Sequence, residues 1–526
     1  MTGLRTLLLL LLLCGCALPP MQGFSDAYLM PKWYVSASVF LLFLVNESIL
    51  LWRGKWTERY DWDGLFRMWS GLVAIVCLYA LAVAADRSGP LTGMFDNPAG
   101  LALYLTFPTA YAVETVWRCR GSRRYVFVGM LSLILTTVVL SESRTGVLAF
   151  IAATGSSFLI RRPCKCRALK GWLLAVLLVL PSVFLFSQKS ESTTGRCFIL
   201  ERTFSLIRKQ PFTGYGRGGF RKTYMAEQAS YFLTHPDDTT SARLADEVSH
   251  PLCEFMIVWI DYGIVGLLLF VAVIGIPCIL YFRTRGSNTL HTLCGMQIVV
   301  CIFSFFSYPF HYPVAWLVVV LTWAAILADG WRLNLKGKRS FVDYSRLVGA
   351  GLCVLWLSGL AWLIRDGMYD HAWAVASQKS QQGYSVAMMS RYRAIYSYKQ
   401  SDPLFLYDYA MEQCYAGRLE QAAQTTERCS RYMSSYNLEL LRGDILRCLH
   451  QETQAMMHYR QAHRMCPVRF APLEGMLSVY AARKGTCAEG DSLATMIIDK
   501  PVKVWSVDIE RIKNKASEYL NQNSYK

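Results

Sequence analysis

Long apolar runs constrain the fold of this 526-residue chain more than any other feature. The segments "VFLLFLVNESILLW", "WSGLVAIVCLYALAVAA", "GWLLAVLLVLPSVFLF" and "GIVGLLLFVAVIGIPCILYF" approach the roughly 20 residues that a helix needs to cross a bilayer. Hydrophobic residues make up 53% of the chain and charged residues only 17%. Soluble domains carry about a quarter charged residues. The sequence therefore predicts an all-α, polytopic membrane protein.

The apolar runs predict about 11 transmembrane helices, with 10 to 12 possible. The expected spans are 4–20, 33–51, 68–85, 99–116, 125–141, 145–160, 171–187, 253–282, 291–308, 313–329 and 346–364. The run "MTGLRTLLLLLLLCGCALPP" at the start is interpreted as the first of these helices. A cleaved signal peptide is the alternative for this run, and it leaves the later topology unchanged.

Basic residues alternate between the two sides of the predicted membrane domain. Lys and Arg cluster after the second, fourth, sixth, eighth and tenth spans, whereas the other short loops hold only Lys32, Arg87 and Arg144. Because cytoplasmic loops carry the excess of Lys and Arg, this pattern places the N-terminus inside. It places loop 188–252 and region 366–526 outside. The net charge of +17 then reflects cytoplasmic loops, since no basic run interleaved with aromatics indicates nucleic-acid binding.

Arg144 stands against this charge pattern. It lies in "SESRTGVLAF", residues 141–150, at an expected outer turn between two spans. One interpretation is a structural arginine that extends from a helix end toward the membrane surface. The other is an arginine that binds an anion at that surface, with Ser141 and Ser143 as hydrogen-bonding neighbours.

The long outer loop combines an amphipathic segment with a glycine-rich one. "RCFILERTFSLIRKQ" has apolar residues at helical spacing and predicts a helix near the membrane surface. "PFTGYGRGGF" suits a tight turn that brings the backbone close to a ligand. It lacks the Lys-Ser/Thr of a phosphate loop. Basic residues of the loop, among them Arg196 and Arg217, suit an acidic substrate such as a pyrophosphate.

"SHPLCEF" opens the eighth expected span. Pro251 is typical of the first turn of a helix, so His250 is expected where the loop meets the membrane. Glu254 then lies one helical turn further on and faces His250. A structural histidine at a helix end is the alternative to a catalytic one.

Together these motifs resemble the O-antigen ligase and polymerase superfamily of bacterial membrane glycosyltransferases, over roughly residues 30–330. The matching segments are "SESRTG", "TTGR" at 193–196, "QPFTGYGRGGF" at 210–220 and "SHPLCEF…DYGIVGLLLF" at 249–270. The resemblance implies transfer of a glycan from undecaprenyl pyrophosphate to an acceptor hydroxyl, with no cofactor and no metal. It also implies a location in the bacterial inner membrane, with loop 188–252 in the periplasm.

The resemblance implies a role for each candidate site residue. Arg144 and Arg196 bind the donor pyrophosphate, and His250 is the candidate base. Arg217, Ser143 and Glu254 are further candidates for substrate binding. His250 departs from the family pattern, because it lies thirteen residues before Gly263 rather than eleven. The alternative bases are Glu254, Asp246 and His235.

The C-terminal region contains an internal repeat. Gly383, Gly417, His450 and Gly485 mark matching points that are 34, 33 and 35 residues apart. This period and the aromatic and alanine pattern resemble tetratricopeptide repeats, which stack helix pairs around a concave binding surface. A small irregular helical domain is the alternative. The chain is thus expected to have a ligase-like transmembrane domain, 1–365, and a periplasmic helical domain, 366–526.

The first choice of function is an O-antigen ligase that uses the lipid A core as acceptor, in lipopolysaccharide biosynthesis. A polysaccharide polymerase and a protein O-oligosaccharyltransferase share the same chemistry and remain alternatives. A polysaccharide flippase or anion transporter is an alternative from another class. It is expected to carry ionisable groups deep within its spans, or paired broken helices. A scaffold built around the repeats, with a protein partner, is the third class.

Overall fold

The structure is a computed structural model, and it describes residues 2–53, 60–84, 89–161, 191–283, 288–334, 341–483 and 488–524. These residues form α-helices, one short 3-10 helix and one π-helical turn, and no strand occurs among them. The all-helical fold class expected from the sequence is confirmed. The helices divide into two compact units, each of which is discontinuous in the chain.

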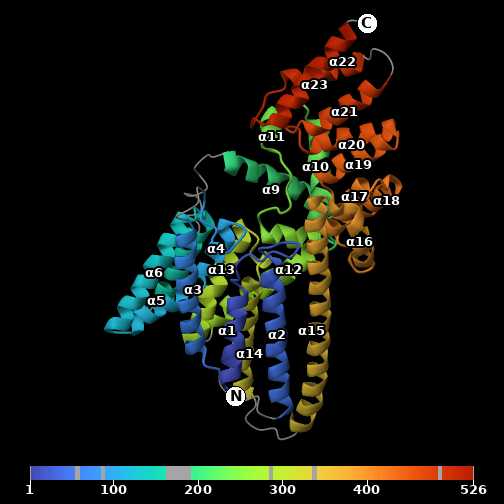
Figure 1. Cartoon of the computed structure of the whole chain (residues 1–526). Helices are drawn as coiled ribbons and strands as arrows, with labels where there is room; N and C mark the ends of the chain where they lie inside the picture. Colours follow the sequence, from blue (N-terminus) through green and yellow to red (C-terminus); the bar gives the residue numbers. More distant parts are fainter. Residues whose placement is uncertain are drawn as a thin grey trace. The chain divides into compact units, whose positions relative to one another are not determined.

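The first unit comprises Met1–Gln188, Leu252–Phe255 and Leu268–Ala374. Its helices are α1 (Thr2–Gly15), α2 (Met30–Trp52), α3 (Trp62–Ala84), α4 (Pro98–Thr106), α5 (Thr109–Arg118), α6 (Ser122–Leu140), α7 (Arg144–Arg161), α13 (Asn288–Phe306), α14 (Pro313–Asn334) and most of α15 (Phe341–Lys379). The helix α12 (Glu254–Arg283) contributes residues to both units. Figure 1 shows α15 as one long helix.

Six helices of the described chain are long and apolar enough to cross a membrane. They are Met30–Trp52, Trp62–Ala84, Ser122–Leu140, Glu254–Leu280, Asn288–Phe306 and the run Arg346–Lys399. Shorter apolar helices occur at Gly3–Gly15 and Pro313–Leu327. The protein is therefore a membrane protein, while the total of 11 spans stays a prediction. The expected span 171–187 lies outside the described residues.

The expected span 99–116 is interrupted, and its place as a membrane span stays a prediction. This segment consists of two short helices, α4 and α5, with Phe107 and Pro108 between them. Proline has no backbone N–H to donate within a helix, and its ring clashes with the preceding turn. The break therefore lies where Pro108 ends the first helix, and both halves are buried in the first unit.

The core of the first unit surrounds α7 and α13. Helix α7 packs against α4, α5, α6 and α13, and α13 also contacts α14. Most of α13 is buried within the protein. Because α7 is enclosed by other helices, the position of its first residue, Arg144, is determined by apolar packing over the length of the helix.

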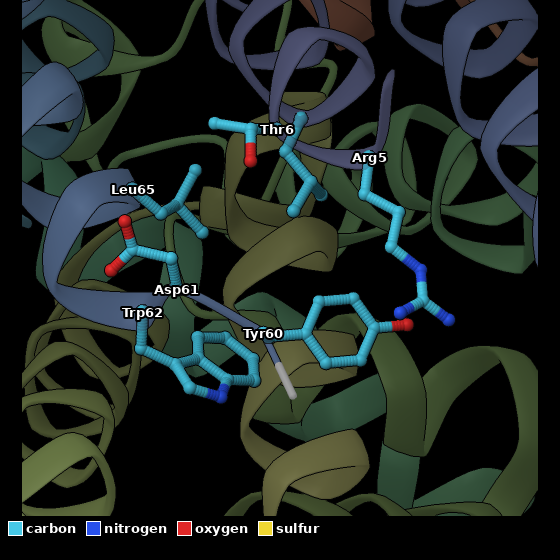
Figure 2. Close-up of a pocket in the computed structure, with 7 residues that line it drawn as sticks. Arg5, Thr6, Tyr60, Asp61, Trp62 and Leu65 are labelled. Atoms are coloured by element: carbon cyan, nitrogen blue, oxygen red, sulfur yellow. The ribbon is translucent and has the colours of Figure 1, made fainter. Parts of the chain in front are cut away.

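The N-terminal helix α1 belongs to this core. Leu12 and Leu13 are buried, and α1 packs against α2 and α3. Arg5 is buried and forms an ion pair with Glu47 of α2, with 2.7 Å between Nε and Oε1. The hydroxyl of Tyr60 donates to the same carboxylate over 2.6 Å, and Figure 2 shows Arg5 and Tyr60 beside each other in a small pocket. The interpretation of this segment as a membrane helix stays a prediction.

The second unit comprises Lys189–Pro251, Met256–Leu267 and Val375–Lys526. Its loop helices are α9 (Glu191–Lys209), α10 (Gly219–Thr234) and α11 (Thr239–Leu244). Its C-terminal helices are α16 (Ser385–Lys399), α17 (Pro403–Tyr415), α18 (Leu419–Ser430), α19 (Tyr436–Cys448), α20 (Glu452–Met465), α21 (Ala471–Ala482), α22 (Ala488–Asp499) and α23 (Val507–Ser524). The expected domain boundary at 365/366 stays a prediction, since these units are not contiguous in sequence.

The C-terminal helices form a tetratricopeptide-like array. Each of α16 to α23 packs against the next one in the chain, as Figure 1 shows. The first helices of successive pairs begin at Pro403, Tyr436 and Ala471, which are 33 and 35 residues apart. This spacing agrees with the period that the sequence indicates.

Gly383, Gly417 and His450, three of the matching points of the repeat, have a positive φ, and Gly485 lies outside the described residues. Gly417 has φ 71° and His450 has φ 59°, and each follows the first helix of a pair. Two backbone hydrogen bonds close each helix. After the first helix, Gly417 N donates to Cys414 O and Arg418 N donates to Gln413 O. In the equivalent turn, His450 N donates to Arg447 O and Gln451 N donates to Leu446 O. This is the Schellman arrangement, in which glycine is preferred. His450 therefore has a left-handed backbone conformation, which residues other than glycine adopt at a cost in free energy.

Candidate functional site

The "SESRTG" motif forms a tight reversal between α6 and α7. Ser141 is buried and its Oγ donates to Val138 O over 2.7 Å, which closes the end of α6. Glu142 adopts φ 57°. The Oγ of Ser143 accepts the N–H of Gly146 over 3.2 Å, so Ser143 caps the start of α7. Both serines thus have structural roles in this turn.

Arg144 is the first residue of α7, and its side chain is exposed. The helix behind it is tightly packed, because a Cβ on Gly146 would lie 2.5 Å from Ala102 Cβ and 3.0 Å from Val138 Cγ1. Gly146 therefore permits the close approach of α7 to α4 and α6. The motif combines a fixed helix start with an exposed cationic side chain, and the helix N-terminus also favours an anion there.

Arg196 lies in the first half of α9 and is partly buried. The expected amphipathic helix over this segment is confirmed, and it extends from Glu191 to Lys209. Other cations of α9 are engaged within the loop. Arg202 lies 4.1 Å from the ring centroid of Tyr231, and Lys209 Nζ lies 2.5 Å from Glu227 Oε2. These cations have structural partners.

The glycine-rich segment docks against a break in α12. Gly263 has φ 67° and ψ −167°, which interrupts the helix and frees the carbonyl groups of the preceding turn. Ile260 O accepts from Tyr215 N over 2.7 Å, and Asp261 O accepts from Gly216 N over 2.9 Å. In return, Ile264 N donates to Pro211 O over 2.9 Å. The segment 211–216 therefore replaces the helical hydrogen bonds that α12 loses.

Close contact explains the glycines of both segments. A Cβ on Gly263 would lie 1.9 Å from Phe212 O, and one on Gly214 would lie 2.5 Å from Ile260 O. The turn brings its backbone close to the protein's own helix, and its approach to a ligand stays a prediction. Arg217 is exposed at the end of the docked segment.

Asp261 is a positioning residue that the sequence analysis did not identify. It is buried, and its Oδ2 accepts the N–H of Gly218 over 2.8 Å at the start of α10. The carboxylate thereby caps α10 in place of a local side chain. An aspartate two residues before a glycine within an otherwise apolar span, "DYG", was the available signal.

His250 lies in an extended segment before α12, not in its first turn. The helix begins at Glu254, and Leu252 has φ 57°, so the chain turns sharply between them. The expectation that Pro251 starts the helix is wrong, because a left-handed residue follows it. The helical one-turn relation between His250 and Glu254 is wrong for the same reason. His250 is partly buried and Glu254 is buried.

Two of the alternative bases have other contacts. The ring of His235 is exposed and stacks on Tyr231 with 4.5 Å between centroids. Asp246 Oδ1 accepts from Arg469 Nη2 over 2.6 Å. The neighbouring Glu247 accepts from the Ser435 hydroxyl and from Asn437 Nδ2. Asp246 and Glu247 thus bind the loop to the repeats.

Apolar packing strengthens this attachment of the loop to the repeats. Helix α10 packs against α20, and loop residues share a buried cluster with residues of α19 and α20. Gln228 Nε2 donates to Met465 O over 2.6 Å, and Ser434 N donates to Arg221 O over 3.0 Å. Contacts between distant segments leave no local pattern in the sequence. The attachment of the loop to the repeats was therefore not predicted.

Arg144 belongs to the first unit, whereas Arg196, Arg217 and His250 belong to the second. Their convergence on one pyrophosphate stays a prediction. Among the described residues, no group of three or more His, Cys, Asp or Glu side chains is arranged to hold a metal ion.

Comparison with protein families identifies the region that contains these residues. Residues 129–271 match the O-antigen ligase family model. The match includes the reversal at Arg144, the loop helices, the docked glycine-rich segment and the break in α12. The resemblance found in the sequence is thus confirmed for this region, and it supports a glycan ligase-like or polymerase-like function.

Comparison with curated proteins finds no match. Among solved structures, the crystal structure of yeast Tom70 aligns with 10% identity over 92% of this chain and 96% of that chain, at a TM-score of 0.26. The Cut9-Hcn1 hetero-tetramer of the APC/C aligns with 13% identity over 93% and 94%, at a TM-score of 0.26. TM-scores this low do not indicate a shared fold. The evidence for the repeat architecture is therefore the set of helix pairs described above.

Proposed function

We propose that this protein transfers a glycan from undecaprenyl pyrophosphate to an acceptor hydroxyl at the periplasmic face of the bacterial inner membrane. The lipid A core is the first choice of acceptor. The observation that carries the proposal is the family match over residues 129–271, which contains every candidate residue. Within that match, the exposed arginine at the start of a buried helix has the chemistry that a pyrophosphate requires.

The transfer replaces one bond at the anomeric carbon of the donor sugar. The bond from that carbon to the pyrophosphate oxygen breaks, and a bond to the acceptor oxygen forms. The acceptor proton passes to the base, for which His250 is the candidate. The leaving group departs as undecaprenyl pyrophosphate with its full negative charge. Arg144 and Arg196 stabilise that charge, because guanidinium stays protonated and can bind two phosphate oxygens.

The structure supports a fixed position for Arg144. A cation that stabilises a developing charge is most effective when it needs no rearrangement during the reaction. The cap at Ser143 and the close packing at Gly146 hold the first turn of α7 in this way. The flippase alternative requires movement of the arginines, which a fixed helix start at Arg144 does not favour.

The test supplies purified protein with undecaprenyl-pyrophosphate glycan and one of three acceptors: lipid A core, a second glycan repeat unit or a peptide. Extension of the lipid A core indicates a ligase, whereas extension of the other two indicates a polymerase or a protein transferase. No transfer to any acceptor would contradict the enzyme function.

Variants of Arg144 link the activity to the site. Arg144→Lys keeps the charge but loses the two-pronged hydrogen bonding, so we expect kcat to fall by about ten- to a thousandfold. Arg123→Lys, at an exposed position of α6, is the matched control and should transfer at the normal rate. Equal transfer rates for the two variants would contradict a role for Arg144 in the mechanism.

A further inference from the structure

A cavity of about 730 Å³ lies within the second unit, between the loop helices and the repeats. One wall comes from α11 and the start of α9, and the other from residues 467–468 and 500–503. Small-molecule sites typically enclose about 300–1,000 Å³. The space is therefore large enough for a short oligosaccharide. None of the described residues that line it is a candidate residue of the transferase site.

The cavity is lined by cations and hydroxyl groups. Arg243, Lys500 and Lys503 contribute three positive charges, and none of the described residues that line the cavity is acidic. Thr194, Thr239 and Thr240 add hydroxyl groups, while proline and valine side chains form the apolar parts of the wall. This combination suits a ligand with a negative charge, several hydroxyl groups and C–H faces.

Two of the cations are held in place by backbone carbonyl groups. Lys500 Nζ donates to Pro467 O over 2.6 Å and to Arg469 O over 3.2 Å. Lys503 Nζ donates to Arg243 O over 2.8 Å, which connects the two walls. Burial lowers the pKa of Lys500 to about 8, so its ammonium group is mostly protonated at pH 7.

The cavity is separate from Arg196, although both adjoin the start of α9. Thr194 lines the cavity, and Arg196 follows two residues later on the same helix. Two residues correspond to a rotation of about 200° around a helix. The side chain of Arg196 therefore leaves α9 on the side away from the cavity.

We propose that this cavity binds an acidic sugar, one that carries a phosphate or a carboxylate. The cations neutralise the anion, the threonines bind the sugar hydroxyl groups and the apolar wall contacts the ring. That the sugar belongs to the acceptor glycan rests on the proposed transferase function, whereas the binding itself does not. In this arrangement the repeats contribute half of an acceptor site.

The first experiment measures binding to the full-length protein in detergent by saturation-transfer NMR. The probes are glucose 6-phosphate and glucuronic acid, with glucose as the neutral control. Inorganic phosphate, which has no C–H protons to observe, serves as the anion control by competing with glucose 6-phosphate. We expect both acidic sugars to bind more tightly than glucose and than phosphate. Equal binding of glucose, or of phosphate alone, would overturn the assignment.

Charge variants locate that binding in the cavity. Arg243→Gln with Lys503→Gln should weaken binding of glucose 6-phosphate at least tenfold. The charge-preserving pair Arg243→Lys with Lys503→Arg should retain it, which excludes a folding defect. Arg391→Gln with Arg431→Gln removes two exposed charges elsewhere in the same unit and should change nothing. Unchanged binding in the first pair would show that the cavity is not the site.

The second experiment measures transfer to an acidic acceptor. The glutamine pair should raise the acceptor KM and leave kcat unchanged, because the cavity holds the acceptor away from the reacting atoms. Weaker sugar binding with an unchanged KM would refute the acceptor assignment. Normal sugar binding by an unaltered protein that transfers no glycan would contradict the proposed function and leave the cavity as a sugar site.

Discussion

Arg144 and the glycine-rich loop are held in place by different kinds of contact. Arg144 begins a helix that is surrounded by apolar neighbours, and at Gly146 this helix comes so close to Ala102 that an added Cβ would lie 2.5 Å from the Ala102 Cβ. The loop is held by backbone hydrogen bonds to α12 and by charged groups that meet the repeats. The first arrangement depends mainly on shape, whereas the second adds many polar contacts to its apolar packing.

This difference predicts how each region responds to change. Apolar packing is insensitive to salt and pH but has little tolerance for added volume. Polar docking tolerates small changes in volume at its edges, but it is sensitive to loss of hydrogen-bond partners and to proton concentration. The loop is therefore the region through which solution conditions should act on transfer.

The largest effect is expected for Gly263→Ala. The backbone conformation of Gly263 is essentially restricted to glycine and costs other residues about 1–3 kcal/mol. The new Cβ would also meet Phe212 O at 1.9 Å. We expect the loop to detach, seen as rapid hydrogen exchange at the Tyr215 and Gly216 amides, and transfer to be lost.

Gly275→Ala is the matched control in the same helix, because its Cβ would meet nothing within 4 Å. It should retain slow exchange and full transfer. Slow exchange at Tyr215 in the Gly263 variant would show that polar docking does not depend on the break.

Gly146→Ala tests the apolar arrangement. Its Cβ would lie 2.5 Å from Ala102 Cβ, and such overpacking costs about 1–3 kcal/mol. We expect a lower melting temperature in detergent, with partial recovery when Ala102→Gly is added. Gly129→Ala on α6, where nothing lies within 4 Å, should melt normally. No recovery in the double variant would place the strain elsewhere.

The pH dependence of stability should reside in the repeat-containing unit. Burial, with the nearby charges of Lys500 and Arg464, lowers the pKa of His463 from 6.5 to about 3. Between these values the unfolded chain binds the proton and the folded chain does not, so stability falls as the pH falls. The loss is about 2 kcal/mol between pH 7 and pH 5. Chemical unfolding at both pH values should show this loss, and His463→Gln should reduce it.

The smallest effect is expected at the repeat turns. His450→Gly removes the cost of a left-handed histidine and should stabilise the array by about 0.5–1 kcal/mol. Gly417→Ala imposes that cost on the equivalent turn and should destabilise it by about 1–2 kcal/mol. Thermal unfolding measures both. A loss of stability in the His450 variant would mean that its side chain contributes more than its backbone costs.

The parts of the fold that follow from local pattern were predictable. Apolar runs indicated the membrane helices, and the 33-to-35-residue spacing indicated the repeat pairs, with Gly417 and His450 at their turns. The exposed position of Arg144 followed from its place between two such runs. The start of α12 was misjudged, because the left-handed conformation of Leu252 has no sequence signal of its own.

Docking between distant segments was not predictable in this way. The hydrogen bonds from Tyr215 and Gly216 to α12 join residues about 45 positions apart, and the Asp246–Arg469 pair joins residues 223 apart. A single sequence contains the hydrogen-bond donors and acceptors, but it does not show which donor meets which acceptor. The acidic-sugar cavity combines residues of α9 and α11 with residues 467–468 and 500–503, so it could not be predicted for the same reason.

The break at Gly263 has a consequence for the order of biosynthesis. The ribosome makes the donor amides of Tyr215 and Gly216 before it makes the carbonyl groups of Ile260 and Asp261 that accept from them. The loop must therefore remain undocked until the first part of α12 has been synthesised. Translation of Ile260 and Asp261 supplies the missing acceptors, so the loop can dock only after the segment that precedes the break has been made.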